Sequence, residues 1–170
     1  MSQMLIESLR FIKLLNVVYK EGLHLGKTNQ RLFEKSIDIE WGNQLNTNVT
    51  AAEQLDAFAA RYSRMQDTLG DKLVPSLLRM LAENTGSNLD NLNRIEKLGL
   101  LVSVTDWLEA RNLRNKMVHE YIDDISELIM AVNRAHQLVT MLVDTYNNIL
   151  TYAQARISID NATWPGILEQ

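Results

Sequence analysis

The chain has 170 residues, no cysteine and a formal net charge of −4. This length suits one domain with a buried core, and the lack of cysteine excludes disulfides and thiolate metal sites. The negative net charge argues against a protein that coats nucleic acid over its whole surface.

No segment has the features of a targeting signal or a membrane span. The N-terminal residues lack the basic start and unbroken apolar run of a signal peptide. No apolar stretch approaches the length needed to cross a bilayer. We therefore expect a cytoplasmic protein without membrane association.

Apolar residues at three- and four-residue steps predict helices from end to end. The first apolar face extends over 5–23, and Gly22 and Gly26 predict a bend or break before Arg31. The polar run 43–50 is expected as a loop.

A capping box at Thr50–Glu53 predicts the start of a second helix, over about 51–69. Gly70 is expected to end this helix. Pro75 is expected early in a following short helix, where its missing donor does no harm.

Two further caps precede the next helices. Ser87 with Asp90 and Ser103 with Asp106 have the spacing at which a side-chain oxygen accepts from a free backbone donor. The longest pattern, over 125–153, predicts the last helix.

These elements predict an all-α fold, an antiparallel bundle of about four to six helices. We expect residues 1–156 to form the single domain and 157–170 to form a C-terminal tail.

One segment combines residue types that suit phosphodiester chemistry: Arg114, Asn115, His119 and Tyr121. Histidine transfers protons near neutral pH, and arginine donates two parallel hydrogen bonds to a phosphate while keeping its charge. Asn115 can orient the imidazole or the phosphate, and Tyr121 can donate to an oxygen. Such a set can cleave RNA without a metal.

The spacing raises a geometric difficulty. On one ideal helix, Arg114 and His119 point about 140° away from each other. The helix could break between Lys116 and His119, the long Arg114 side chain could curl round, or the groups could converge from two subunits across a two-fold axis. We favour two subunits, combined with some distortion.

The segment resembles the HEPN family (higher eukaryotes and prokaryotes nucleotide-binding), and the resemblance covers roughly 98–129. It rests on Leu98-Gly-Leu-Leu101, the Ser103–Trp107 cap and Arg114-Asn115-x-x-x-His119-x-Tyr121. It implies an antiparallel helical bundle that forms a homodimer, with two motifs flanking one cleft.

The resemblance also implies a metal-independent endoribonuclease of a toxin–antitoxin pair, with no cofactor, that a partner nucleotidyltransferase neutralises. Arg114 would stabilise the charge on the phosphate, His119 would transfer protons, and Asn115 and Tyr121 would assist. Tyr121 would also be the residue that the partner adenylylates. The alternative is a non-catalytic HEPN subunit that binds nucleotide or serves as an adaptor for the nucleotidyltransferase.

Arg111, Arg114 and Lys116 form a local cationic patch, and we expect RNA rather than DNA to bind through Arg111 and Lys116. A solvated helix surface would have the same pattern. His24 and His136 lack neighbours at metal-ligand spacing, so we expect no metal site and assign both to the surface or to packing.

Overall fold

The computed structural model describes residues 2–119 and 123–170, with only the backbone described at His119. Every element in these ranges is helical, so the predicted all-α class is confirmed. No helix in the described ranges is long and apolar enough to cross a membrane. In chain order the elements are α1 (Gln3–Leu32), α2 (Ile39–Asn43), α3 (Val49–Asp67), the π-helical η1 (Thr68–Leu73), α4 (Val74–Met80), α5 (Asn88–Lys97), α6 (Val104–His119) and α7 (Ile125–Arg156).

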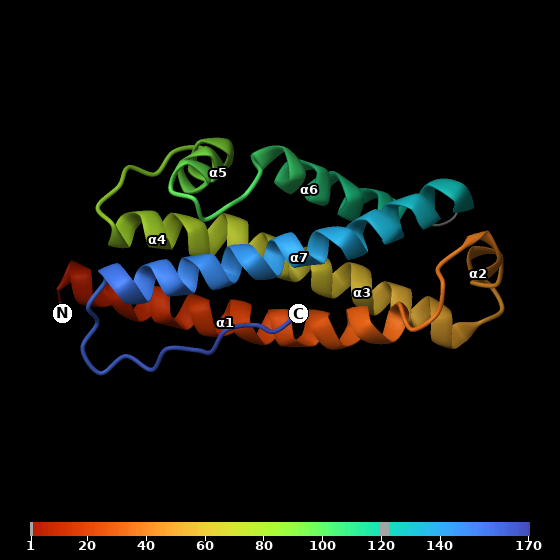
Figure 1. Ribbon diagram of the computed structural model, residues 1–170, viewed down its shortest axis with the longest axis horizontal. Helices are drawn as coiled ribbons and strands as arrows, with labels where there is room; N and C mark the ends of the chain where they lie inside the picture. The colour runs from red at the N-terminus through yellow and green to blue at the C-terminus, as the bar shows by residue number, and fades with distance from the viewer. Residues whose placement is uncertain (1, 120–122) are drawn as a thin grey trace.

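The long helices lie side by side and alternate in direction, as in an antiparallel bundle (Figure 1). α1 packs against the continuous rod of α3, η1 and α4, and α7 contacts both α1 and α3. α6 packs along α7 and also contacts α3. One side of α6 therefore lies beside α3, and this position matters for the candidate site.

The core forms because each long helix turns an apolar stripe inward. The largest fully buried side chains come from α1, α3, α6 and α7: Phe11, Phe58, Tyr62, Trp107 and Tyr146. Burying one large apolar side chain stabilises the fold by about 1.5–3 kcal/mol. The shared core thus holds α6 against the other helices.

α3 does not end at Gly70, so that prediction is wrong. The chain instead widens into the π-helical turn η1 and continues directly into α4. Gly70 lies against the ring of Trp107, and a Cβ added at Gly70 would be 2.7 Å from Trp107 Cζ2. The glycine therefore permits close packing of α6 on this rod. Pro75 lies in the first turn of α4, as its fixed φ predicts.

α1 continues through Gly22 and Gly26 to Leu32, so the break predicted before Arg31 does not occur. Glycine lowers helix propensity by about 1 kcal/mol, but packing on neighbouring helices can outweigh that cost. α1 packs on α3, η1, α4 and α7, which support it along its length.

Of the predicted helix starts, two are confirmed and one is wrong. Ser87 and Asp90 form a full capping box at α5, and Ser103 Oγ accepts from the Asp106 N–H at 3.1 Å. At α3 the cap is Asn48, whose Oδ1 accepts from the Ala51 N–H at 3.1 Å. Asn48 replaces Thr50 because α3 begins earlier than the sequence pattern suggested.

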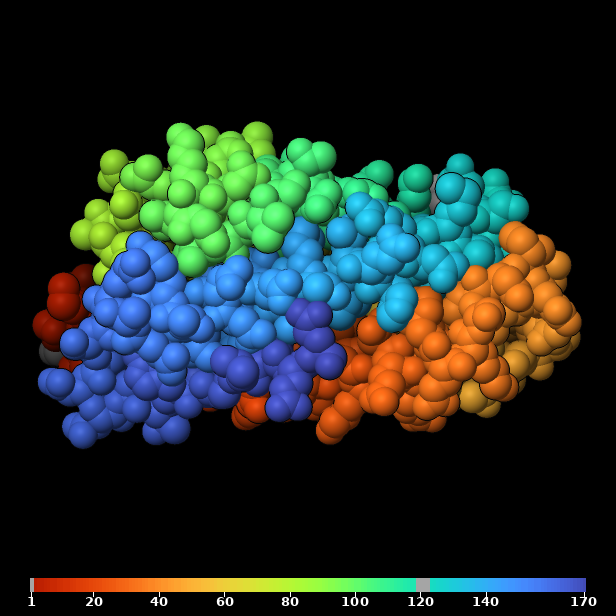
Figure 2. All heavy atoms as spheres, viewed as in Figure 1, coloured from red at the N-terminus to blue at the C-terminus, as the bar shows by residue number. Residues whose placement is uncertain are grey.

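Residues 157–170 follow α7 as an extended segment that lies on the bundle surface along α1 and α7 (Figure 2). Trp164 packs edge-on against Phe11, with ring centroids 6.5 Å apart. Asn147 bonds both the N–H and the carbonyl of Leu168, at 2.8 and 2.9 Å. The buried Leu168 side chain fills the space left by Gly22. The tail is thus held on the face that Figure 2 shows.

Candidate functional site where α6 meets α3 and η1

α6 is fixed by contacts at both its start and its buried side. The Val104 N–H donates to Glu96 Oε2 at 2.6 Å, which satisfies a free donor of the first turn. Its inward side buries five residues at three- and four-residue steps: Val104, Trp107, Ala110, Leu113 and Met117. Arg114, seven residues after Trp107, lies beside this stripe and faces α3, whereas Arg111 is half-buried and Asn115 is exposed.

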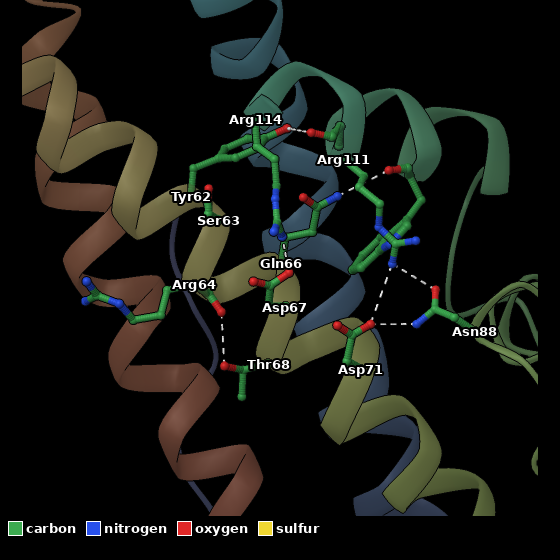
Figure 3. A network of polar contacts seen from close by, with 12 residues as sticks. Tyr62, Ser63, Arg64, Gln66, Asp67, Thr68, Asp71, Asn88, Arg111 and Arg114 are labelled. Carbon is green, nitrogen blue, oxygen red and sulfur yellow. Dashed lines mark hydrogen bonds and ion pairs between the residues drawn. The ribbon is translucent and has the colours of Figure 1, made fainter. Parts of the chain in front are cut away.

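Two side chains of α3 attach to the backbone of α6 (Figure 3). Tyr62 Oη donates to the Ala110 carbonyl at 3.3 Å, and Gln66 Nε2 donates to the Trp107 carbonyl at 3.2 Å. Burial raises the pKa of Tyr62 well above its usual value, so its hydroxyl remains protonated and able to donate. These bonds set the position of α6 relative to α3.

Arg114 points across to α3, where Nη1 donates to Asp67 Oδ1 (Figure 3). The guanidinium is partly buried, whereas about half of the Asp67 side chain is exposed, at 47%. An exposed carboxylate can be replaced at an arginine by a competing phosphate, because both accept from the same planar fork.

Arg111 lies one turn before Arg114 and joins three elements. Its Nη2 donates to Asn88 Oδ1 of α5 at 2.9 Å and lies 3.5 Å from Asp71 Oδ1 of η1. Asn88 Nδ2 in turn donates to Asp71 at 2.6 Å. Figure 3 shows this network beside the Arg114–Asp67 pair.

The two arginines line one shallow surface depression of about 360 Å³. Its other lining residues are Asp67, Asp71, Asn88 and Asn115. Asn115 is exposed, and its side chain lines this depression. We call this depression the α6 site. It brings together three of the expected residues: Arg111, Arg114 and Asn115.

Lys116, expected to bind RNA beside Arg111, lies elsewhere. It lines a separate depression of about 200 Å³ between α6 and α7, with Glu109, Glu127 and Arg134. Two residues along a helix rotate a side chain by about 200°, so Lys116 cannot share the side that carries Arg114. The α6 site therefore does not include it.

The His119 side chain and Tyr121 lie outside the described residues. The backbone of α6 is helical through His119, so the break considered between Lys116 and His119 does not occur. On this unbroken helix the directions of Arg114 and His119 still differ by about 140°. This angular separation remains, because the Arg114 side chain is directed towards α3.

Sequence reasoning did not identify the acidic and amide partners of the α6 site. Asp67, Asp71 and Asn88 come from elements far from the motif in sequence. One signal could have identified the two acids. Asp67 and Asp71 are four residues apart, and such a pair lies on one side of a helix, as do Arg111 and Arg114 three apart.

The described residues contain no group of three histidine or acidic side chains that could hold a metal. His136 Nδ1 lies 2.8 Å from Asn29 Oδ1, and its ring stacks on Phe33 with centroids 3.8 Å apart. Burial lowers the pKa of His136, which favours a neutral packing residue between α7 and α1.

Comparisons of this chain with protein-family models, with curated proteins and with solved structures found no match.

Proposed function

We propose that the protein is a metal-independent HEPN-type endoribonuclease that cleaves RNA by attack of the 2′-hydroxyl on phosphorus. The observation that carries this proposal is the α6 site, where Arg111, Arg114 and Asn115 line one open depression. These groups can bind a phosphate and stabilise its growing charge. His119, at the end of the same helix, supplies the proton transfer.

The catalytic groups of two copies would meet across a homodimer cleft. The outer side of α6 favours this arrangement, because the large apolar Leu108 and Val118 are 41% and 60% exposed there. On the helix they flank Arg111 and Asn115, so apolar contacts with a second copy would surround the polar centre. His119 of one copy would then act with Arg114 of the other, which removes the angular difficulty within one helix.

The proposed system includes a nucleotidyltransferase antitoxin that adenylylates Tyr121. Adenylylation would place a phosphate charge and a bulky nucleotide next to His119, and both would oppose RNA entry.

The direct test is cleavage of a labelled RNA by the purified protein in the presence of a chelator. We expect products with cyclic phosphate ends, and we expect His119→Ala to lower the rate by about 10²- to 10⁴-fold, because it removes the proton-transfer group. Arg114→Gln should also lower the rate, whereas Arg10→Gln, at an exposed position near the far end of α1, should not.

Circular dichroism and the melting temperature of His119→Ala confirm that a loss of rate does not come from unfolding. Cleavage that requires a divalent metal, or full activity of a folded His119→Ala, would contradict the proposal. A wild-type protein that binds RNA or nucleotide but cuts no RNA would instead support the non-catalytic alternative.

A further inference from the structure

A second group of arginines lies where α1 packs against α3. Arg31 of α1 and Arg61 of α3 line a surface depression of about 230 Å³, together with Thr28, Gln54 and Ala57. Arg64 follows Arg61 by three residues on the same side of α3. We call Arg31, Arg61 and Arg64 the arginine seam.

Arg61 is held by neutral acceptors. Its Nη1 donates to Thr28 Oγ1 at 2.5 Å and to the His24 carbonyl at 3.2 Å. Thr28 is only 7% exposed, so the guanidinium is anchored on a buried hydroxyl. Neutral acceptors fix the orientation of a cation without cancelling its charge, and this preorganises Arg61 for an anionic ligand.

In other arginines of the bundle, a nearby carboxylate balances the positive charge. The side chains of Arg79, Arg94, Arg111, Arg114 and Arg134 each form an ion pair with a carboxylate. Within residues 2–119 and 123–170, no such pair is found for the three arginines of the seam. The seam is therefore a place where positive charge remains available to a ligand.

Two acids lie near the seam and do not cancel it. Glu53 lines the same depression as Arg61. Glu21, on α1, accepts from Thr68 Oγ1 at 2.9 Å, and its burial raises its pKa while the nearby Arg64 acts in the opposite direction. Glu53 and Glu21 therefore offset only part of the charge of the three guanidinium groups, and Glu21 is already bonded to a hydroxyl.

The seam continues towards the α6 site across α3. Arg64 precedes Asp67, the partner of Arg114, by three residues, a rise of about 4.5 Å. Figure 3 shows the Arg64 side chain directed away from Asp67, towards α1.

We propose that the arginine seam binds the backbone phosphates of single-stranded RNA on one side of the phosphate held at Arg114. This inference rests on the proposed function, because it treats the α6 site as the place where the RNA is cut. Guanidinium groups at fixed positions suit successive phosphates, and contacts to phosphate position a strand without reading its sequence. A single strand fits because its backbone can bend from the seam over α3 into the α6 site.

The test measures binding of a 2′-O-methyl RNA of about twelve nucleotides, which lacks the attacking hydroxyl and cannot be cut. Affinity is followed by fluorescence polarisation between about 50 and 200 mM salt. Arg61→Gln and Arg64→Gln should each weaken binding roughly threefold and reduce the slope of log K against log salt by about 0.7, the value for one lost single-strand phosphate contact.

The matched control is Arg10→Gln, which removes the same charge from α1 at least ~20 Å from the residues that contact Arg61. It should bind like the wild type. Arg61→Lys keeps the charge and should retain most of the salt slope, which separates loss of charge from loss of structure.

A dinucleotide with one phosphodiester separates this inference from the proposed function, because it is too short to reach the seam. Arg61→Gln and Arg64→Gln should cut this dinucleotide at the wild-type rate. If they bind the long RNA with the affinity and salt slope of Arg10→Gln while RNA is still cut, the seam proposal is overturned and the nuclease stands. If no RNA is cut but the seam variants still weaken binding, the nuclease fails and the seam stands.

Discussion

At the residue scale, the Arg114 guanidinium can pair with the Asp67 carboxylate or, as proposed, with an RNA phosphate. Both groups accept hydrogen bonds from the same planar fork. An exposed ion pair contributes about 0–1 kcal/mol, and hydrogen bonds to charged groups contribute about 1.5–3 kcal/mol. The Arg114–Asp67 pair can therefore give way to a phosphate at modest cost. In the free chain Asp67 orients Arg114 towards α3 and also lowers the positive charge of the α6 site.

Asp67→Asn tests this competition directly. The change keeps an acceptor for Arg114 but removes one negative charge from the lining of the depression. We expect RNA affinity to increase several-fold at low salt, with the unfolding free energy changed by less than about 1 kcal/mol. Fluorescence polarisation with the uncleavable RNA measures the affinity.

Asp160→Asn serves as the control, because it makes the same change of charge at an exposed position in the tail. At physiological salt, charges more than about 8 Å apart are largely screened, so the control should bind like the wild type. Weaker binding by Asp67→Asn would mean that the carboxylate is needed to hold Arg114 in place.

At the scale of elements, the π-helical turn η1 determines how closely α6 approaches the α3–α4 rod. The wider turn and the missing side chain of Gly70 make room for the Trp107 ring. Tyr62 and Gln66 then bond the backbone of α6 from the same rod. Arg111 and Arg114 come within reach of η1 and α3 only because this packing is close.

Gly70→Ala should therefore destabilise the protein. The added methyl group would overlap Trp107, and overpacking in a core costs about 1–3 kcal/mol, more than the gain in helix propensity of about 1 kcal/mol. Chemical denaturation followed by circular dichroism measures the change. Gly26→Ala is the control, because open space surrounds that position and the helix should become slightly more stable. Equal stabilisation by both substitutions would exclude the close contact as the reason for Gly70.

At the scale of the whole molecule, the α6 site and the tail occupy different faces. Figure 2 shows the face formed by α1, α7 and the tail, whereas Figure 3 shows the side where α3 lies between α1 and α6. Contacts such as His136 with Asn29 join α7 to α1 and hold the bundle as one body. The stability of the whole molecule should depend on the protonation of this histidine.

Burial lowers the pKa of His136 in the folded chain, whereas the unfolded chain has the ordinary value of about 6.5. The unfolded chain therefore takes up the proton more readily, and stability falls as the pH decreases below about 6.5. We expect the melting temperature to fall between pH 7.5 and 5.5, and His136→Gln should reduce this dependence. His24→Gln replaces an exposed histidine in the same way and serves as the control. If His136→Gln retains the full pH dependence of the melting temperature, that dependence comes from other groups.

Local patterns were sufficient to predict most helices and two of the caps. The spacing of apolar residues over 125–153 matches α7, and the Ser87–Asp90 pair forms the predicted box. Of the motif on α6, Arg114 and Asn115 share the depression with Arg111, whereas the His119 side chain and Tyr121 lie outside the described residues. These features depend on residues within a few positions of each other, so they can be predicted from the sequence alone.

The sequence by itself therefore determined that the chain is helical, where most helices begin, and which segment gathers residue types that suit phosphodiester chemistry. Only the tertiary structure decided that Gly70 packs under Trp107, that Arg114 bonds Asp67 and that Arg61 is anchored on Thr28. The Arg114–Asp67 pair joins residues 47 positions apart, and the Arg61–Thr28 pair joins residues 33 positions apart. Helix spacing and caps arise within one or two turns, whereas these contacts depend on which helices pack together and at what distance, and the folded core sets both.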